Sequence, residues 1–176
     1  MQDDEQVFTD LYERHRGAVY ALLLGRTSDP SVASDLLQET FLRLWRRLPD
    51  VSGLEPGRQR AWLVTVARNL VIDRYRAQAT RRATDQVIAQ REPRPDPYDH
   101  GTAERAVLAD QLDQLDRHIA ELPEAQRVVL SMHVVADMNS QEIADALDLP
   151  AGTVRSRLHA ARVRLAAALE PEPESR

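Results

Sequence analysis

Arginine is gathered without any carboxylate near the C-terminal end of the chain. Residues 149–169 hold four arginines and no acidic residue, although the formal net charge of the whole chain is -5. A guanidinium group is a planar donor that can form paired hydrogen bonds with phosphates and with the edges of bases. A carboxylate among these arginines would repel a nucleic-acid backbone, so the composition of this segment predicts contact with nucleic-acid phosphates.

A second basic segment lies in the middle of the chain. Residues 57–82 contain seven arginines and one acid, Asp73, whereas residues 83–116 contain eight acids and three arginines. All 23 basic residues are arginine, which a GC-rich genome mainly explains. The alternation of basic and acidic segments nevertheless indicates two nucleic-acid contacts on one chain.

No pattern in the chain is typical of an enzyme, a metal site or a secreted protein. There is no cysteine, and the five histidines lack the paired spacing of metal ligands. The acidic N-terminus has no signal-peptide pattern, and no apolar run approaches the roughly 18 residues of a membrane span. We therefore expect a cytoplasmic, non-enzymatic protein without cofactor, metal or membrane insertion.

Residues 140–165 have the pattern of a helix-turn-helix. Asn139 and Glu142 have the spacing of a capping box, which opens a predicted helix over 140–147. The letters DLPA predict a tight turn, and Pro150 suits the first turn of a second helix. Helical spacing turns one apolar face of this helix inward and a polar face toward solvent. That polar face carries Arg155, Ser156, His159 and Arg162.

Helical periodicity also dominates the rest of the chain, and no strand alternation is seen. Helices are predicted at about 5–25, 30–48, 58–78, 103–121 and 124–136, with a loop at 49–57. The proline-rich and acidic segment REPRPDPYDHG predicts a flexible linker. The predicted architecture is all-α, with two small helical domains. Their boundaries are 1–78 for the first domain, 79–104 for the linker, 105–170 for the second domain and 171–176 for a disordered tail.

Four motifs in order resemble one family. They read DLLQETFLRLW (35–45), RAWLVTVARNLVIDRYR (60–76), ELPEAQRVVL (121–130) and QEIADALDLPAGTVRSRL (141–158). This layout is similar to the extracytoplasmic-function (group IV) sigma factors of bacterial RNA polymerase. The resemblance implies that a first domain, region 2, binds the clamp of the β′ subunit and melts the promoter −10 element. It implies that region 4 binds the −35 element and the flap of the β subunit, with the linker running through the polymerase.

The resemblance also implies roles for individual residues. The loop 49–59 matches one that accepts a flipped base, whereas Ala160 stands where the family often has arginine. The implied clamp-binding residues are Asp35, Gln38, Glu39 and Arg43. The implied −10 contacts are Arg68, Asn69, Asp73, Arg74 and Arg76, and the implied −35 contacts are Thr153, Arg155, Ser156, Arg157, His159 and Arg162.

Two other classes of protein fit parts of the sequence. A stand-alone helix-turn-helix repressor or activator would bind a palindrome as a dimer, but it would not need VARNLVIDRYR (66–76) in its first domain. An adaptor that binds proteins alone leaves both arginine segments unexplained. The expected partners are therefore core polymerase, promoter DNA and an anti-sigma protein that holds the chain inactive.

Overall fold

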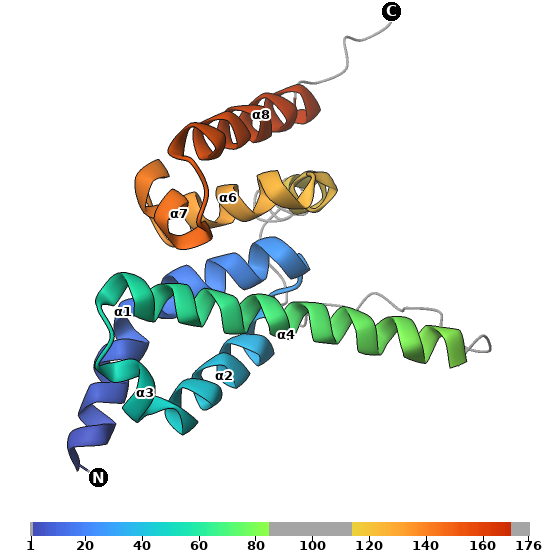
Figure 1. Cartoon of the computed structure of the whole chain (residues 1–176). Coiled ribbons are helices and arrows are strands. Elements are labelled where there is room, and N and C mark those ends of the chain that lie inside the picture. Colours follow the sequence, from blue (N-terminus) through green and yellow to red (C-terminus); the bar gives the residue numbers. More distant parts are fainter. Residues whose placement is uncertain (1, 85–113, 170–176) are drawn as a thin grey trace, which may run out of the picture.

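The structure is a computed structural model that describes residues 2–84 and 114–169. Every regular element in these two ranges is a helix, which confirms the all-α class (Figure 1). Residues 114–121 form a helical segment before α6. The other helices are α1 (Gln2–Thr27), α2 (Pro30–Arg46), α3 (Leu48–Ser52), α4 (Pro56–Thr84), α6 (Glu124–Val134), α7 (Ser140–Leu147) and α8 (Ala151–Leu169).

A side-chain cap marks the boundary between α1 and α2. Asp29 accepts hydrogen bonds from the amides of Ser31 at 2.9 Å and Val32 at 3.1 Å. Pro30 occupies the first turn of α2, where a backbone N–H would have no acceptor within the helix, so the lack of an N–H costs no hydrogen bond. These features make Asp29 the residue that caps α2.

The second predicted helix ends earlier than its apolar pattern indicates. The backbone of Arg47 leaves the helical region with φ -118° and ψ 17°, and Pro49 lies in the first turn of the separate helix α3. Much of the predicted loop 49–57 is therefore helical. Leu48 and Val51 are buried under this short helix, which fixes its position against the core.

Helix α4 extends six residues beyond its predicted end at position 78 and leaves the body of the molecule (Figure 1). The added letters, ATRRAT, contain no glycine or proline, and alanine and arginine have high helix propensity. The predicted linker thus begins with helix over 79–84. The rest of the predicted linker and the predicted tail lie outside the described residues.

The helix-turn-helix forms as its capping pattern predicts. The Asn139 side chain accepts from the amide of Glu142 at 3.0 Å, and the Glu142 carboxylate accepts from the amide of Asn139 at 2.8 Å. Asp148 ends α7 in the left-handed conformation, with φ 53°. Its amide donates to the carbonyl of Ala144, which is buried where the two helices meet.

The N-terminal helices α1–α4 share a core of leucine, valine and alanine side chains. Phe8 on α1 meets Phe41 and Trp45 on α2 edge to face, with ring centroids 6.4 and 5.3 Å apart. Such contacts add specific geometry to the burial of apolar area. Trp62 is half-buried and packs against the same core.

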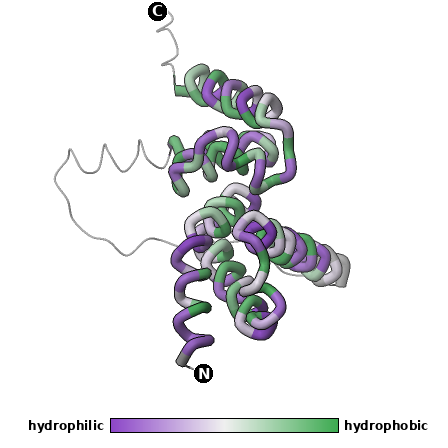
Figure 2. Tube along the Cα trace, turned by 60° about the vertical axis from the view of Figure 1, so that its left-hand side comes forward, coloured by the Kyte–Doolittle hydropathy of each residue, from purple (hydrophilic) through white to green (hydrophobic). Residues whose placement is uncertain are grey.

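The two groups of helices are not separate bodies. Helix α1 lies between the other N-terminal helices and the helix-turn-helix, and its C-terminal half packs against α6 (Figure 1). One continuous hydrophobic cluster joins Leu22 of α1 to Val128 and Met132 of α6. Figure 2 shows hydrophobic positions on the helices of both groups. The second helical domain therefore rests directly on the first.

A buried histidine couples the fold to pH. His15 on α1 is 1% exposed, and its pKa is lowered by burial and by the charges of Arg60 and Arg14. The unfolded chain consequently takes up a proton near the ordinary histidine pKa of about 6.5, where the folded chain does not.

We expect the free energy of unfolding to be maximal above about pH 6.5 and to fall as the pH drops below that value. The difference between wild type and His15→Leu should change by up to about 1.4 kcal/mol per pH unit in that window. Urea titrations of both proteins from pH 8 to pH 5 measure this difference in unfolding free energy. A difference that stays constant with pH would contradict the assignment to His15.

Candidate nucleic-acid interface

Helix α8 has one buried face and two polar flanks. Val154, Leu158 and Ala161 are buried against the C-terminal helices. At about 100° per residue, Arg155, His159 and Arg162 fall within about 60° of one another on one flank. All three are exposed, with Ser156 beside them. This flank is the reading face, defined as Arg155, Ser156, His159 and Arg162.

Arg162 is held by a histidine that the sequence pattern did not single out. Its guanidinium lies 2.9 Å from Nε2 of His133 on α6, and Nδ1 of His133 lies 2.8 Å from the carbonyl of Met138. A guanidinium can only donate and a carbonyl can only accept, so this geometry requires the neutral ring with its proton on Nδ1. His133 therefore orients a predicted −35 contact.

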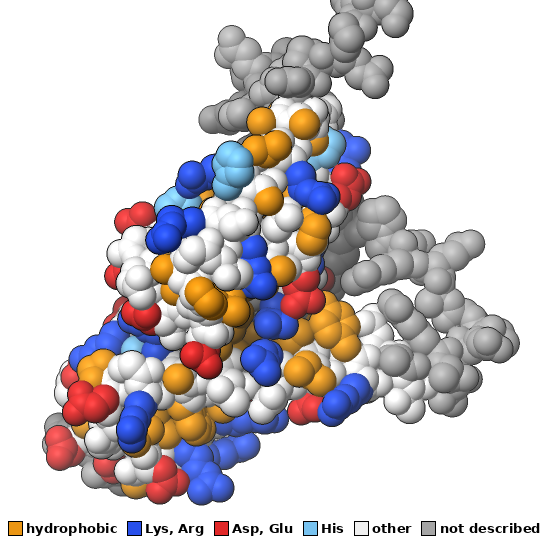
Figure 3. Space-filling view, turned by 45° about the horizontal axis from the view of Figure 1, so that its top comes forward, with side chains coloured by type: hydrophobic (Ala, Val, Ile, Leu, Met, Phe, Trp, Pro, Cys, Tyr) orange, Lys and Arg blue, Asp and Glu red, His pale blue; other side chains and the backbone are white. Residues whose placement is uncertain are grey.

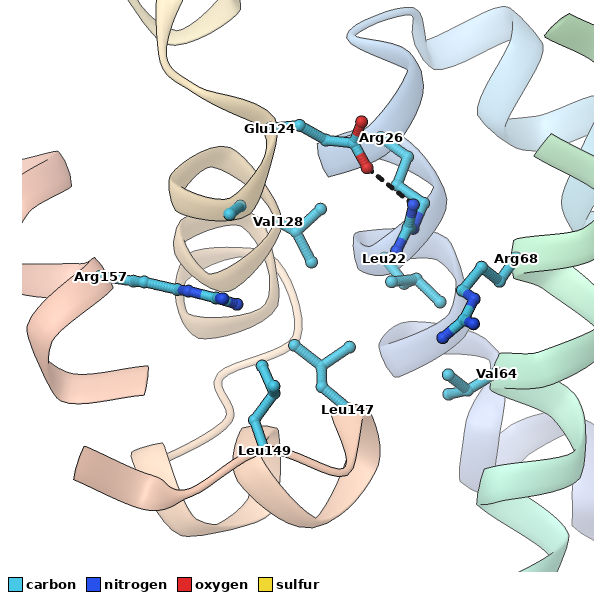
Figure 4. A pocket seen from close by; sticks show the side chains of 10 residues that line it. Leu22, Arg26, Val64, Arg68, Glu124, Val128, Leu147, Leu149 and Arg157 are labelled. Atoms are coloured by element: carbon cyan, nitrogen blue, oxygen red, sulfur yellow. Dashed lines mark hydrogen bonds and ion pairs between the residues drawn. The ribbon is translucent and has the colours of Figure 1, made fainter. Parts of the chain in front are cut away.

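The other two predicted −35 residues lie on the opposite flank of α8. Thr153 and Arg157 are both half-buried and fall within about 40° of each other around the helix axis. Arg157 points into a cavity of about 340 Å³ between the N-terminal and C-terminal helices (Figure 4). The structure thus brings four of the six predicted residues onto one face and directs Arg157 elsewhere.

The five predicted −10 residues are all exposed on α4, but they do not share one face. Asn69, Asp73 and Arg76 fall within about 60° of one another around the helix axis. Asp73 and Arg76 form a loose ion pair with an O–N distance of 4.0 Å. Arg68 is turned about 100° away from Asn69, toward the cavity that Arg157 also lines. Arg74 is turned about 140° away from Asn69.

The predicted clamp-binding residues form a polar face on α2. Asp35 and Gln38 are exposed, whereas Glu39 and Arg43 are half-buried. Glu39 accepts a hydrogen bond from Nε of Arg43 at 2.9 Å, so the charges of this pair offset each other. Among the described residues, no cation is paired with Asp35, which leaves its carboxylate available to a partner.

Two exposed apolar side chains complete this face. Leu42 is 51% exposed and lies on the same face of α2 as Asp35, Gln38 and Glu39. Trp45 is 44% exposed and lies one turn after Leu42 and two turns after Gln38 on this face. Apolar and aromatic side chains ringed by polar groups are typical of protein-binding surfaces. We define the α2 docking face as Asp35, Gln38, Glu39, Leu42 and Trp45. Sequence periodicity missed the apolar pair because exposure depends on what covers α2.

Positive side chains are spread over the outer surface of the C-terminal helices. Figure 3 shows arginine and histidine side chains on the upper part of the molecule, and further arginines where the upper and lower parts meet. The first turn of α8 carries no acidic residue. A helix begins with free N–H groups and a positive dipole end, so the start of α8 favours a phosphate in both respects.

The helices and their basic faces correspond to two DNA-binding regions of bacterial transcription initiation factors. Residues 11–81 match the model of sigma-70 region 2, and residues 112–165 match the model of sigma-70 region 4. The chain belongs to the extracytoplasmic-function (ECF) family of RNA polymerase sigma factors. Proteins of this family are DNA-binding initiation factors rather than classical enzymes. The chain accordingly has the function of an ECF sigma factor, which directs core polymerase to promoters.

Curated relatives from two different bacteria are similar to this chain and support this assignment. The chain is 35% identical to the ECF RNA polymerase sigma factor SigL of Mycobacterium tuberculosis, over 85% of this chain and 81% of that protein. It is 27% identical to the ECF RNA polymerase sigma factor SigM of Bacillus subtilis, over 90% of this chain and 92% of that protein. Both alignments therefore cover most of each protein.

Solved structures share the fold. The sigma factor RpoE of Bartonella quintana, in complex with the anti-sigma factor NepR, aligns with a TM-score of 0.64 at 20% identity, over 98% of this chain and all of that one. CnrH, in complex with the cytosolic domain of CnrY, aligns with a TM-score of 0.56 at 26% identity, over 96% and 91% of the two chains.

No helix in the described part of the chain combines the length and the apolar character that crossing a membrane requires.

Proposed function

We propose that this sigma factor grips the promoter at two points, with the α4 face on the −10 element and the α8 reading face on the −35 element. The observation that carries this proposal is the pair of exposed, arginine-bearing faces on two helices that belong to separate matched regions. Phosphate contacts fix the register of a protein on DNA, and contacts to base edges supply sequence preference.

On α4 we assign base contact to Asn69 and backbone contact to the neighbouring cations. An amide both donates and accepts, so it can pair with the edge of an unstacked base. Asp73 lies beside Asn69, and its only ion-pair partner among the described residues is Arg76, at 4.0 Å. Arg76, Arg74 and Arg68 then reach phosphates from three sides of the helix.

The turn between α3 and α4 is suited to hold a flipped base. Gln59 is buried and its side-chain amide donates to the carbonyl of Ser52 at 3.0 Å, which joins the end of α3 to the start of α4. Extruding a base costs a few kcal/mol, so a pocket that receives it must be held in place beforehand. We assign that pre-organising role to Gln59.

On α8 we assign base contacts to Arg155 and Ser156, near the beginning of the helix, and phosphate contacts to His159 and Arg162. Helix-turn-helix proteins read the major groove with the N-terminal part of the second helix. Thr153 and Arg157 lie on the other flank, and we assign them to the phosphates of the opposite strand. We expect the −35 DNA sequence that this chain prefers to depend on these side chains and on the small Ala160.

Polymerase and an inhibitor are the protein partners that we propose. The α2 docking face combines the exposed carboxylate of Asp35 with apolar side chains, which suits the clamp of the β′ subunit. Relatives of known structure were solved with an anti-sigma factor or with the cytosolic domain of CnrY, and we propose that a protein of that kind holds this chain inactive. Because polymerase and promoter are cytoplasmic in bacteria, we place the chain there, without enzymatic activity of its own.

The test of this proposal is transcription from a promoter library. The purified chain is mixed with core polymerase, and RNA 5′ ends are mapped against a reaction without the chain. We expect new, specific start sites that share sequences near −10 and −35. Binding to a palindrome without any gain in initiation would instead favour a stand-alone repressor.

The salt dependence of promoter binding tests the α4 face. Each phosphate contact contributes about 0.7 to 0.9 to the slope of log K against log salt concentration. Arg76→Ala in the holoenzyme should reduce that slope by this amount. Arg16→Ala, which removes an exposed arginine of α1 paired with Glu13, is the control and should leave the slope unchanged. An equal slope for Arg76→Ala and wild type would remove Arg76 from the phosphate contacts.

A further inference from the structure

The cavity of about 340 Å³ has a cationic wall. Arginines from three helices line it, namely Arg26 of α1, Arg68 of α4 and Arg157 of α8. The one carboxylate among its lining residues is Glu124 of α6, which accepts a hydrogen bond from Nη1 of Arg26 at 2.7 Å. The charges of Arg68 and Arg157 are therefore not offset by any lining residue, in a chain whose formal net charge is -5.

Two of these guanidinium groups have unused hydrogen-bond donors. Within residues 2–84 and 114–169, neither Arg68 nor Arg157 forms an ion pair or a side-chain hydrogen bond. Figure 4 shows the two side chains on opposite sides of the cavity, with Leu22 and Val128 between them. A guanidinium carries five N–H donors and cannot accept a hydrogen bond, so both side chains require an acceptor from outside the described residues or from water.

A third donor on the same wall is buried. Nε of Arg26 is shielded from solvent and has no acceptor among the described residues, although Nη1 of the same side chain binds Glu124. A buried donor that lacks an acceptor is unfavourable, because it has lost its hydrogen bonds to water. An anion with several oxygen atoms offers the acceptors that this wall lacks.

The rest of the lining limits the size and the chemistry of that anion. Apolar walls come from Leu22, Val64, Val128, Leu147 and Leu149. Such walls exclude water and strengthen the attraction between opposite charges. The volume lies near the lower end of the range for small-ligand sites, which suits a small anion. The planar guanidinium fork matches the oxygen atoms of a phosphoryl group, and a diphosphate has one such group for each of the two unpaired arginines.

We propose that this cavity is a binding site for a diphosphate, either inorganic pyrophosphate or the diphosphate group of a nucleotide. Arg68 and Arg157 each donate to one phosphoryl group, while Arg26 lines the site and stays paired with Glu124. The site itself is independent of the proposed function. Its consequence rests on that function, because Arg68 and Arg157 are also assigned to promoter phosphates. A bound diphosphate therefore competes with promoter DNA for these two side chains.

Isothermal titration calorimetry of the whole chain with sodium pyrophosphate tests the site. We expect saturable binding of one pyrophosphate per chain. Arg68→Ala and Arg157→Ala should each weaken binding by about tenfold or more, since each removes hydrogen bonds to a charged group. Arg164→Ala is the matched control, because Arg164 is an exposed arginine of α8 outside the cavity, and it should change the affinity by less than about twofold. Absence of saturable binding, or equal weakening by Arg157→Ala and Arg164→Ala, would overturn the site.

Two comparisons separate geometry from charge and identify the source of the diphosphate. Arg157→Lys keeps the charge without the planar fork, so it should regain only part of the affinity that Arg157→Ala loses. Full recovery would mean that charge alone attracts pyrophosphate, which contradicts a built site. A nucleoside diphosphate is then titrated at the same ionic strength. Tighter binding than that of pyrophosphate supports a nucleotide whose base contacts the apolar walls, and equal or weaker binding supports inorganic pyrophosphate.

Promoter binding tests the consequence. The chain is mixed with core polymerase in pyrophosphate or in orthophosphate, at equal ionic strength and equal free magnesium, and promoter affinity is measured without nucleotides. At a pyrophosphate concentration ten times its Kd, simple competition predicts about tenfold weaker promoter binding by wild type, and a smaller difference for Arg157→Ala. Equal promoter affinity in both buffers would overturn the competition. If wild type binds no promoter even in orthophosphate, the proposed function fails, while calorimetry still decides the diphosphate site.

Discussion

Asp35→Arg should reduce the affinity of the chain for core polymerase by about 30-fold or more. Asp35 is exposed on α2, and no described cation is paired with it, so its carboxylate is accessible to the proposed polymerase partner. Replacing one member of a buried charge pair at an interface costs about 2 to 5 kcal/mol, and tenfold in affinity corresponds to about 1.4 kcal/mol.

Binding of labelled chain to core polymerase measures this effect, and run-off transcription gives an independent measurement. Asp10→Arg is the control, since Asp10 is an exposed acid on α1 that lies outside the α2 docking face. It makes the same change in net charge. If both variants lost affinity equally, the loss would reflect net charge, and the assignment of the docking face would be wrong.

Leu44→Ala should lower the free energy of unfolding by about 2 to 5 kcal/mol. Leu44 lies on α2 and is fully buried in the core shared by α1–α4. Truncation removes buried methyl groups and leaves a cavity whose walls relax only in part. Because stabilities of small domains are about 5 to 15 kcal/mol, such a loss would unfold a substantial part of a marginal domain.

Leu42→Ala is the matched control, made two residues away on the same helix. Leu42 is 51% exposed, so its truncation should change the unfolding free energy by less than about 0.5 kcal/mol. Urea titrations followed by helical circular dichroism compare the two variants with wild type. Equal losses for Leu42→Ala and Leu44→Ala would mean that α2 is not packed as described. For the affinity toward core polymerase, Leu42→Ala should cause a larger loss than Leu44→Ala, since Leu42 belongs to the α2 docking face.

Much of the local structure follows from short-range chemistry. Asp29 before Pro30, and Asn139 three residues before Glu142, place the beginnings of α2 and α7 correctly because capping involves neighbours in the chain. The predicted end of the α4 helix was too early, since neither alanine nor arginine stops a helix. The division of one apolar stripe into α2 and α3 depends on the backbone of Arg47, which periodicity does not report.

The amino-acid order alone thus specified the all-α class, the helix-turn-helix and the exposed arginines of α4 and α8, since periodicity and capping act over a few residues. Folding in three dimensions decided which groups meet across the chain. Three contacts show this: α6 packs against Gly25, His133 lies within hydrogen-bond distance of Arg162, and Arg157 points into the cavity. The residues in these contacts are from 29 to 103 positions apart in the chain. Such contacts depend on the fit between whole helix surfaces, which no local pattern encodes.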